Sequence, residues 1–272
     1  MQGKRVGMYQ NPTTEMFDHG VDSCVTVLTA ICMCKYVLAV DSSPIVLLVL
    51  CAVGFTGFHS PTYEHLITNK MIFRGGPTNP TEALIITQVV LVIAGLFPTF
   101  FHSPFIRFLV VAASVASVLS LAHSIHELFI YYKKDVNKTI HSTLRGYGPL
   151  FFVISLSLVW FPFLGDFYKN HSTLCMLTLA LPWNYSIFRT IINEITAVKN
   201  LDTMSVLTGQ LPAVIPAISH VVGIPMIIAL PITFALSAFM YFYTVVVSLR
   251  EVCDALGMEH FWSIRDERKL KK

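Results

Sequence analysis

The segment Glu15-Met16-Phe17-Asp18-His19-Gly20-Val21-Asp22-Ser23 places three carboxylates and a histidine directly before a long apolar run. Successive residues of an α-helix are rotated by about 100°, so these carboxylates and the imidazole would share one polar face. Ionisable groups at membrane depth are costly and usually mark a functional site. The segment therefore predicts a membrane helix with a site at its mouth.

The composition of the chain is that of a membrane protein. Of its 272 residues, 54% are hydrophobic and 13% are charged, and the mean hydropathy is +0.64. These values are too apolar for an ordinary soluble domain, so we predict an all-α polytopic membrane bundle forming one domain over residues 1–272. The net charge of +3 provides no general basic surface for nucleic acid. The six cysteines show no CxxC spacing and are interpreted as buried free thiols.

A membrane-spanning helix needs about 20 apolar residues. By this rule the sequence predicts about eight spans, at Val21–Val40, Ile45–Phe58, Ala83–Phe101, Phe108–His126, Tyr147–Phe163, Thr173–Ile192, Val206–Val222 and Met226–Leu249. The seventh span contains Pro212 and Pro216 and is expected to be irregular. Residues 1–20 then form an N-terminal segment, 21–249 the bundle and 250–272 a tail.

The positions of Lys and Arg predict the orientation. With both termini in the cytosol, most of the 19 basic residues fall on the cytosolic side, whereas Lys35, Arg107 and Lys169 fall on the other. The acidic segment then opens toward soluble nucleotides. Residues 59–82 and 131–146 are expected to be loops on the same side. The second loop is basic, and we interpret it as a solvated loop in preference to one that contacts anionic lipid.

Carboxylates at positions i and i+4 lie one above the other on a helix. Mg²⁺ takes six oxygen ligands and is commonly bound by one or two carboxylates together with substrate phosphate. His19, beside the carboxylates, has a reference pKa suited to general-base catalysis, and Thr26 and Thr29 extend the polar stripe. Acidic residues also favour the first turn of a helix because of its dipole. The residues alone leave the metal–phosphate site and the helix-start interpretation equally open.

Three stretches resemble one protein family. Glu15–Ser23 resembles the second half of the signature of the CDP-alcohol phosphatidyltransferases, in particular the eukaryotic choline/ethanolamine phosphotransferase branch, which reads close to P-L-G-E-L-F-D-H-G-C-D-S. Pro61–His65 and Pro80–Ile85 are similar to the family's aromatic-Glu and P-x-E-G-x-L elements. Val252–Met258, followed by Phe261–Ile264, resembles its terminal I-C-x-x-L-x-I and F-S-I pattern.

The full family signature is D-x-x-D-G-x-x-A-R, eight further residues, and G-x-x-x-D-x-x-x-D. Asp18 and Asp22 match its last two aspartates, Thr14 stands at the glycine, and Arg5 falls on the arginine. The first two aspartates would lie upstream of Met1. The resemblance therefore implies the ten-helix family fold without its first two helices, in an N-terminally shortened chain whose activity is in question.

The activity implied by the resemblance is the transfer of phosphoethanolamine or phosphocholine from CDP-ethanolamine or CDP-choline to diacylglycerol, with release of CMP. Mg²⁺ or Mn²⁺ would be bound by Asp18, Asp22 and Glu15. His19 would be the general base for the lipid hydroxyl, and Arg5 would contact phosphate.

Tyr63, Glu64 and Glu82 are the candidates for binding the cationic headgroup, through charge and cation–π attraction, with a structural role equally open. The choice between choline and ethanolamine is also open. The expected partners are these substrates and the lipid bilayer, with a homodimer left open, and the expected location is the endoplasmic reticulum or the Golgi. The alternative hypothesis is an inactive family member that serves as a membrane partner or regulator.

Overall fold

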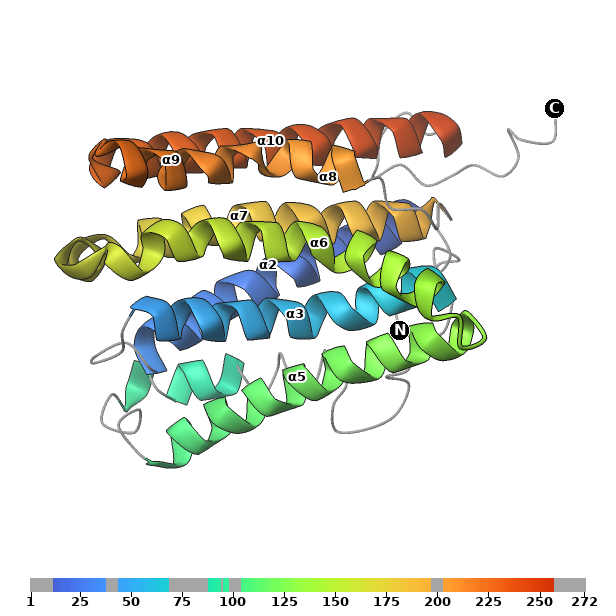
Figure 1. The fold of residues 1–272 in the computed structure, drawn as a ribbon, viewed down its shortest axis with the longest axis horizontal. Helices are drawn as coiled ribbons and strands as arrows, with labels where there is room; N and C mark the ends of the chain where they lie inside the picture. The colour runs from blue at the N-terminus through green and yellow to red at the C-terminus, as the bar shows by residue number, and fades with distance from the viewer. Residues whose placement is uncertain are drawn as a thin grey trace.

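The computed structural model describes residues 12–37, 44–68, 88–93, 95–97, 104–196 and 203–256, and the regular structure within these ranges is helical. The long helices lie side by side as a bundle (Figure 1). They are α2 (Pro12–Val37), α3 (Pro44–Thr68), α5 (Pro104–Tyr131), α6 (Val136–Trp160), α7 (Gly165–Ile195), α8 (Thr203–Gln210), α9 (Val214–Val222) and α10 (Met226–Leu256), with 3₁₀ turns η2 (Phe161–Phe163) and η3 (Leu211–Ala213). The predicted all-α class is confirmed for this part of the chain.

The predicted spans fall mainly on these helices, apart from Ala83–Phe101, much of which lies outside the described residues. By length and composition, four helical stretches of the described chain are able to cross a membrane, namely Pro44–Thr68, Val136–Phe163, Thr203–Val222 and Met226–Ala255. The structure thus shows an all-helical protein of membrane type. Free cysteines are found at Cys24, Cys32, Cys51, Cys175 and Cys253. The interpretation as buried free thiols is confirmed for the last three, whereas Cys24 and Cys32 are half-buried.

Several predicted boundaries are wrong, because apolar runs mark only the most hydrophobic part of each helix. Helix α2 begins at Pro12, nine residues before the predicted span, and the acidic segment is helical as expected. Residues 59–68 are not a loop but the last part of α3, which continues through Pro61. Their polar side chains are accommodated because neighbouring helices bury them. At the other end of the sequence, α10 runs past Leu249 to Leu256.

The predicted basic loop at 131–146 is also wrong, since only a short turn separates α5 from α6. Lys133 and Lys134 adopt left-handed backbone angles, with φ of 54° and 65°. Asp135 then caps α6 by accepting a hydrogen bond of 3.1 Å from the backbone N–H of Lys138. This bond lowers the pKa of Asp135. The cap starts α6 at Val136, so Lys138 and Arg145 are helical, whereas Lys133 and Lys134 lie in the turn.

The irregular seventh span is confirmed. Residues 203–222 form α8, the 3₁₀ turn η3 containing Pro212, and α9 containing Pro216. Proline lacks an N–H donor and interrupts helical hydrogen bonding. The buried Gln210, at the end of α8, donates a hydrogen bond of 3.1 Å to the Pro182 carbonyl of α7, and Gly223, with φ of 85°, ends α9. The break itself is thus covered by neighbouring helices, since Gln210, Pro212 and Ala213 are buried.

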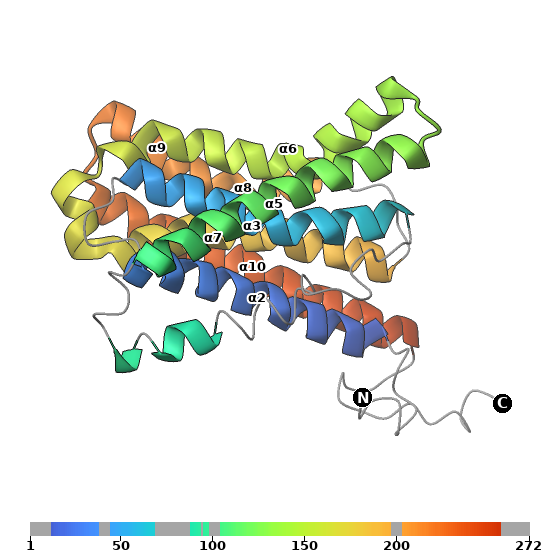
Figure 2. The same ribbon diagram turned by 90° about the horizontal axis from the view of Figure 1, so that it is seen from below.

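Cross-contacts show which helix ends lie together. Tyr63 and His59 of α3 contact Ser142 and Gly146 of α6, so these two helices are antiparallel. Helix α2 is likewise antiparallel to α7, because Gly20 contacts Phe188 and Cys24 contacts Asn184. The start of α2, the ends of α3, α7 and α10 and the α5–α6 turn therefore gather at one end of the bundle, as Figures 1 and 2 also show. We call this the acidic-helix end, after the first turns of α2.

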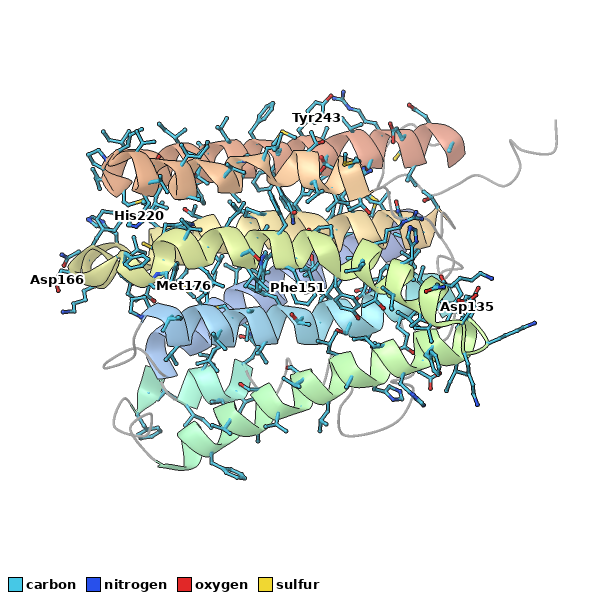
Figure 3. All side chains as sticks on the ribbon, in the orientation of Figure 1. Asp135, Phe151, Asp166, Met176, His220 and Tyr243 are labelled. Atoms are coloured by element: carbon cyan, nitrogen blue, oxygen red, sulfur yellow. The ribbon has the colours of Figure 1, made fainter. Side chains whose placement is uncertain are left out.

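Basic residues are distributed unequally between the two ends. Toward the acidic-helix end lie Lys133, Lys134, Lys138, Arg145, Arg189 and Arg250. At the opposite end, Lys169 donates a hydrogen bond of 2.7 Å to Asp166, which lowers the pKa of that carboxyl. Figure 3 labels Asp135 and Asp166 at the two opposite ends. The unequal distribution predicted from the sequence is present in the fold.

Gly146 is a sensitive point in the contact between α3 and α6. A Cβ atom added here would overlap the Tyr63 ring, whereas a Cβ at Gly148 meets nothing within 4 Å. We expect Gly146→Ala to destabilise the folded bundle by about 1–3 kcal/mol through overpacking. Thermal unfolding of the purified protein in detergent measures the effect. Gly148→Ala is the matched control, expected to be neutral or slightly stabilising, and an equal effect of both substitutions would contradict this packing.

Candidate functional site

Asp18, His19 and Asp22 share one face of α2, as predicted. Asp18 is exposed, and His19 and Asp22 are half-buried. The charges of both Asp18 and His19 act on Asp22. Asp18 and Asp22 are four residues apart, so their backbones are separated by about 6 Å along the helix axis. This face presents two neighbouring carboxylates and an imidazole in an accessible position.

The opposite side of α2 holds the helix in place. Met16 is buried in an apolar cluster with Phe188 of α7 and Val252 of α10. About two turns further on, Cys24 accepts a hydrogen bond of 3.2 Å from Asn184 and lies 3.2 Å from the Tyr241 hydroxyl. Helices α7 and α10 thus cover the face of α2 that carries Met16 and Cys24. The carboxylate face points away from these two helices.

The threonines that extend the polar stripe are both hydrogen-bonded. Thr26 donates to the Asp22 carbonyl within α2, at 2.8 Å. Thr29 accepts a bond of 2.8 Å from Gln88, which begins the described helical segment 88–93. The stripe therefore continues into a contact with a second helical segment.

Some predicted site residues lie outside the described part of the chain. Arg5 and Glu82 are among them, and Glu15 lies in α2 with its side chain not described. Within the described residues, no three His, Cys, Asp or Glu side chains are grouped so that they could hold a metal. Mg²⁺ is commonly bound by one or two carboxylates together with water and substrate phosphate. Asp18 and Asp22 would supply the two carboxylates. The donor set fits a metal shared with a phosphate-containing ligand.

Tyr63 and Glu64 lie elsewhere, at the interface of α3 with α5 and α6. Tyr63 is 1% exposed and donates a hydrogen bond of 2.7 Å to the Ser142 carbonyl. Its ring stacks on His59 and meets Tyr147 edge-on. In the described part of the chain, Tyr63 bonds to Ser142 of α6 and Glu64 to Ser124 of α5. Tyr63 therefore serves the packing of α3 against α6.

Buried polar side chains lie next to Tyr63, and they were not predicted from the sequence. The His59 Nε2 atom lies 3.1 Å from the Gly146 carbonyl oxygen, while its Nδ1 atom has no partner within the described chain. Glu64 is 2% exposed, and one of its carboxylate oxygens also lacks a partner there. Polar residues spaced three to five apart inside an apolar helix were the available signal. It was missed because residues after Phe58 were assigned to a loop.

A second missed feature is the hydrogen bond between the imidazole of His65 on α3 and the carboxylate of Glu194 on α7. Both side chains are mostly covered, and they join the ends of the two helices at the acidic-helix end. Their separation of 129 positions in the sequence left no local signal for this contact.

The chain was also compared with known proteins. A scan against models of protein families finds no match, and a search of curated proteins finds no similar sequence. The resemblance to the CDP-alcohol phosphatidyltransferases therefore depends on the quoted motifs alone, of which Asp18-His19-Gly20-Val21-Asp22 is the most specific.

The packing role of Tyr63 can be tested by removing its hydroxyl. We expect Tyr63→Phe to lower stability by about 1 kcal/mol, because the hydrogen bond to the Ser142 carbonyl is buried. Thermal unfolding in detergent measures this loss. Tyr243→Phe is the control, because Tyr243 is 57% exposed on α10 and labelled in Figure 3. Equal midpoints for both variants would show that the buried bond does not stabilise the bundle.

Proposed function

We propose that this chain is a metal-dependent transferase that moves phosphoethanolamine or phosphocholine from a CDP-alcohol to diacylglycerol and releases CMP. The observation that supports this best is the accessible face of α2, where Asp18, His19 and Asp22 lie together. These residues belong to the most specific motif of the resemblance. This face of α2 points away from the apolar cluster that contains Met16, so a nucleotide could reach it.

The roles follow from the chemistry of these side chains. Asp18 and Asp22, with Glu15, would hold Mg²⁺ or Mn²⁺, which when bound offsets the charge of the diphosphate and of departing CMP. His19 would take the proton from the lipid hydroxyl. The hydroxyl oxygen then forms a bond to the phosphorus that carries the alcohol, and the bond from that phosphorus to the bridging oxygen breaks, leaving CMP. Arg5 would contact phosphate.

The membrane arrangement is part of the proposal. Four described stretches are apolar and long enough to cross a bilayer, and we propose about eight spans in the whole chain. Basic residues gather toward the same end as Asp18, which supports a cytosolic position for that end and for both termini. Diacylglycerol would enter sideways from the bilayer, in the endoplasmic reticulum or the Golgi.

Headgroup binding is assigned to carboxylates. Glu64 and Glu82 would attract the positive charge of the alcohol, with Tyr63 as the aromatic candidate named from the sequence. Glu64 and Tyr63 are buried between α3, α5 and α6, so this part of the proposal requires the headgroup to reach that interface from the carboxylate face of α2. Ethanolamine and choline carry the same charge, so the proposal covers both.

The first test replaces the carboxylates. Purified protein is assayed with radiolabelled CDP-ethanolamine or CDP-choline, dioleoylglycerol and Mg²⁺, and lipid product is counted. We expect Asp18→Asn and Asp22→Asn each to lower the rate by about 100-fold or more, because a loss of several kcal/mol in charge stabilisation has at least this effect. Asp166→Asn, an exposed aspartate at the opposite end, should stay within about twofold of the wild-type rate.

Absence of product from a folded wild-type protein with both CDP-alcohols would contradict the proposal. It would favour the alternative of a non-catalytic membrane partner. Full activity of Asp22→Asn would equally exclude the assigned metal site.

The second test separates the base from the metal ligands. We expect His19→Gln to lower kcat by about 10²–10⁴-fold, while Mn²⁺ binding in the presence of CDP-ethanolamine, followed by electron paramagnetic resonance, is retained. Asp22→Asn should instead weaken that Mn²⁺ signal. EDTA should abolish turnover, and added Mg²⁺ should restore it. Loss of Mn²⁺ binding in His19→Gln would show that the imidazole is a ligand and not the base.

A further inference from the structure

A cavity of about 470 Å³ lies where α3, the α5–α6 turn and the first turns of α6 meet. This volume is within the range of sites for small ligands, about 300–1,000 Å³. The cavity lies at the ends of two stretches able to cross a membrane, Pro44–Thr68 and Val136–Phe163. Its polar wall is formed by Tyr63, Tyr132, Asn137, Lys138, His141 and Arg145.

The wall is built on one side of α6. Asn137, His141 and Arg145 follow one another at intervals of four residues, so they form a ridge about 12 Å long. Lys138 lies beside the ridge. The residues that line the cavity include two permanent cations and no carboxylate. Such a set of cationic and amide donors matches the oxygens of a phosphate group.

Lys138 is positioned to serve an added anion. Its ammonium lies 3.4 Å from an oxygen of Asp135, but the two side chains are 70% and 37% exposed. Ion pairs in water are weak, and the other Asp135 oxygen accepts the backbone N–H of Lys138 as the α6 cap. The turn thus keeps the lysine at the edge of the cavity without a strong competing bond.

Exposed apolar side chains stand next in the chain to residues of the cavity wall. The last turn of α5 and the first turns of α6 expose Ile130, Tyr131, Val136, Ile140 and Leu144, by 41–63% each. A soluble anion would leave these side chains in contact with water. An anionic lipid places its phosphate in the cavity and its acyl chains along this apolar surface, which satisfies both features.

We propose that this cavity binds the phosphate group of an anionic membrane lipid. Lys138 and Arg145 pair with the phosphate, and Asn137 and His141 donate hydrogen bonds to it. The acyl chains lie against the exposed apolar side chains of α5 and α6. The site is separate from the carboxylate face of α2 and does not depend on the proposed transferase activity. Of the two sequence interpretations of residues 131–146, the fold thus favours lipid contact over a solvated loop.

The test uses the full chain in phosphatidylcholine nanodiscs or detergent micelles. Dioctanoyl phosphatidic acid is titrated, and binding is followed by microscale thermophoresis, with dioctanoyl phosphatidylcholine and inorganic phosphate as comparison ligands. We expect phosphatidic acid to bind at least tenfold more tightly than either. The double variant Lys138→Gln/Arg145→Gln should lose at least tenfold in affinity. The control Lys133→Gln/Lys134→Gln removes the same amount of charge from the adjoining α5–α6 turn, outside the cavity wall, and should change affinity by less than twofold.

Equal losses in the two double variants would overturn the proposal, because they indicate diffuse attraction to a basic surface. Inorganic phosphate binding as tightly as phosphatidic acid would overturn it as well, by showing a soluble-anion site. If the Arg145 variant does not fold, Lys138→Gln and His141→Gln decide the matter, since both side chains are exposed. Each should weaken binding of phosphatidic acid by about threefold, and unchanged affinity in both would contradict the proposal.

Discussion

The burial of α7 is the constraint on which the rest of this structure depends. From Thr178 to Asn193 nearly every residue of this helix is buried, so it must be covered on all sides by other helices. Trp183, fully buried, packs edge-on against Phe55 of α3. On another side the Tyr185 ring occupies the space left open by Gly209 of α8. Figures 1 and 2 show α7 running through the bundle with neighbours around it.

The polar residues of α7 are as informative as its apolar ones. Asn184 donates a hydrogen bond to the Cys24 sulfur of α2. The Thr190 hydroxyl donates a hydrogen bond to the Ser186 carbonyl of its own helix. Backbone and side-chain polar groups without water must find partners inside the protein. The bond between Asn184 and Cys24 joins α7 to α2 and, with the buried Met16, sets the rotation of α2. The carboxylate face of α2 is accessible because the side that carries Met16 and Cys24 is the one tied to α7.

Two chemically opposite regions occur toward the same end of the bundle. One is the acidic face of Asp18 and Asp22, suited to a metal and a diphosphate. The other is the basic cavity of Lys138 and Arg145, suited to a phosphate without a metal. The two regions are on different helices, the acidic face on α2 and the basic cavity wall on α6. Under the two proposals above, a lipid phosphate would bind at a place separate from the proposed chemistry.

The sequence alone determined the helical class, the membrane character and the shared face of Asp18, His19 and Asp22, because hydrophobic runs and helical spacing are local properties. It did not determine where helices end, since Asp135 and the residues after Phe58 are stabilised by capping and by neighbouring helices. Only the tertiary structure decided that Tyr63 is packed against α6, that His65 pairs with Glu194, and that basic residues of α6 surround a cavity. Each of these depends on contacts between residues far apart in the chain, and such contacts leave no periodic signal in the sequence.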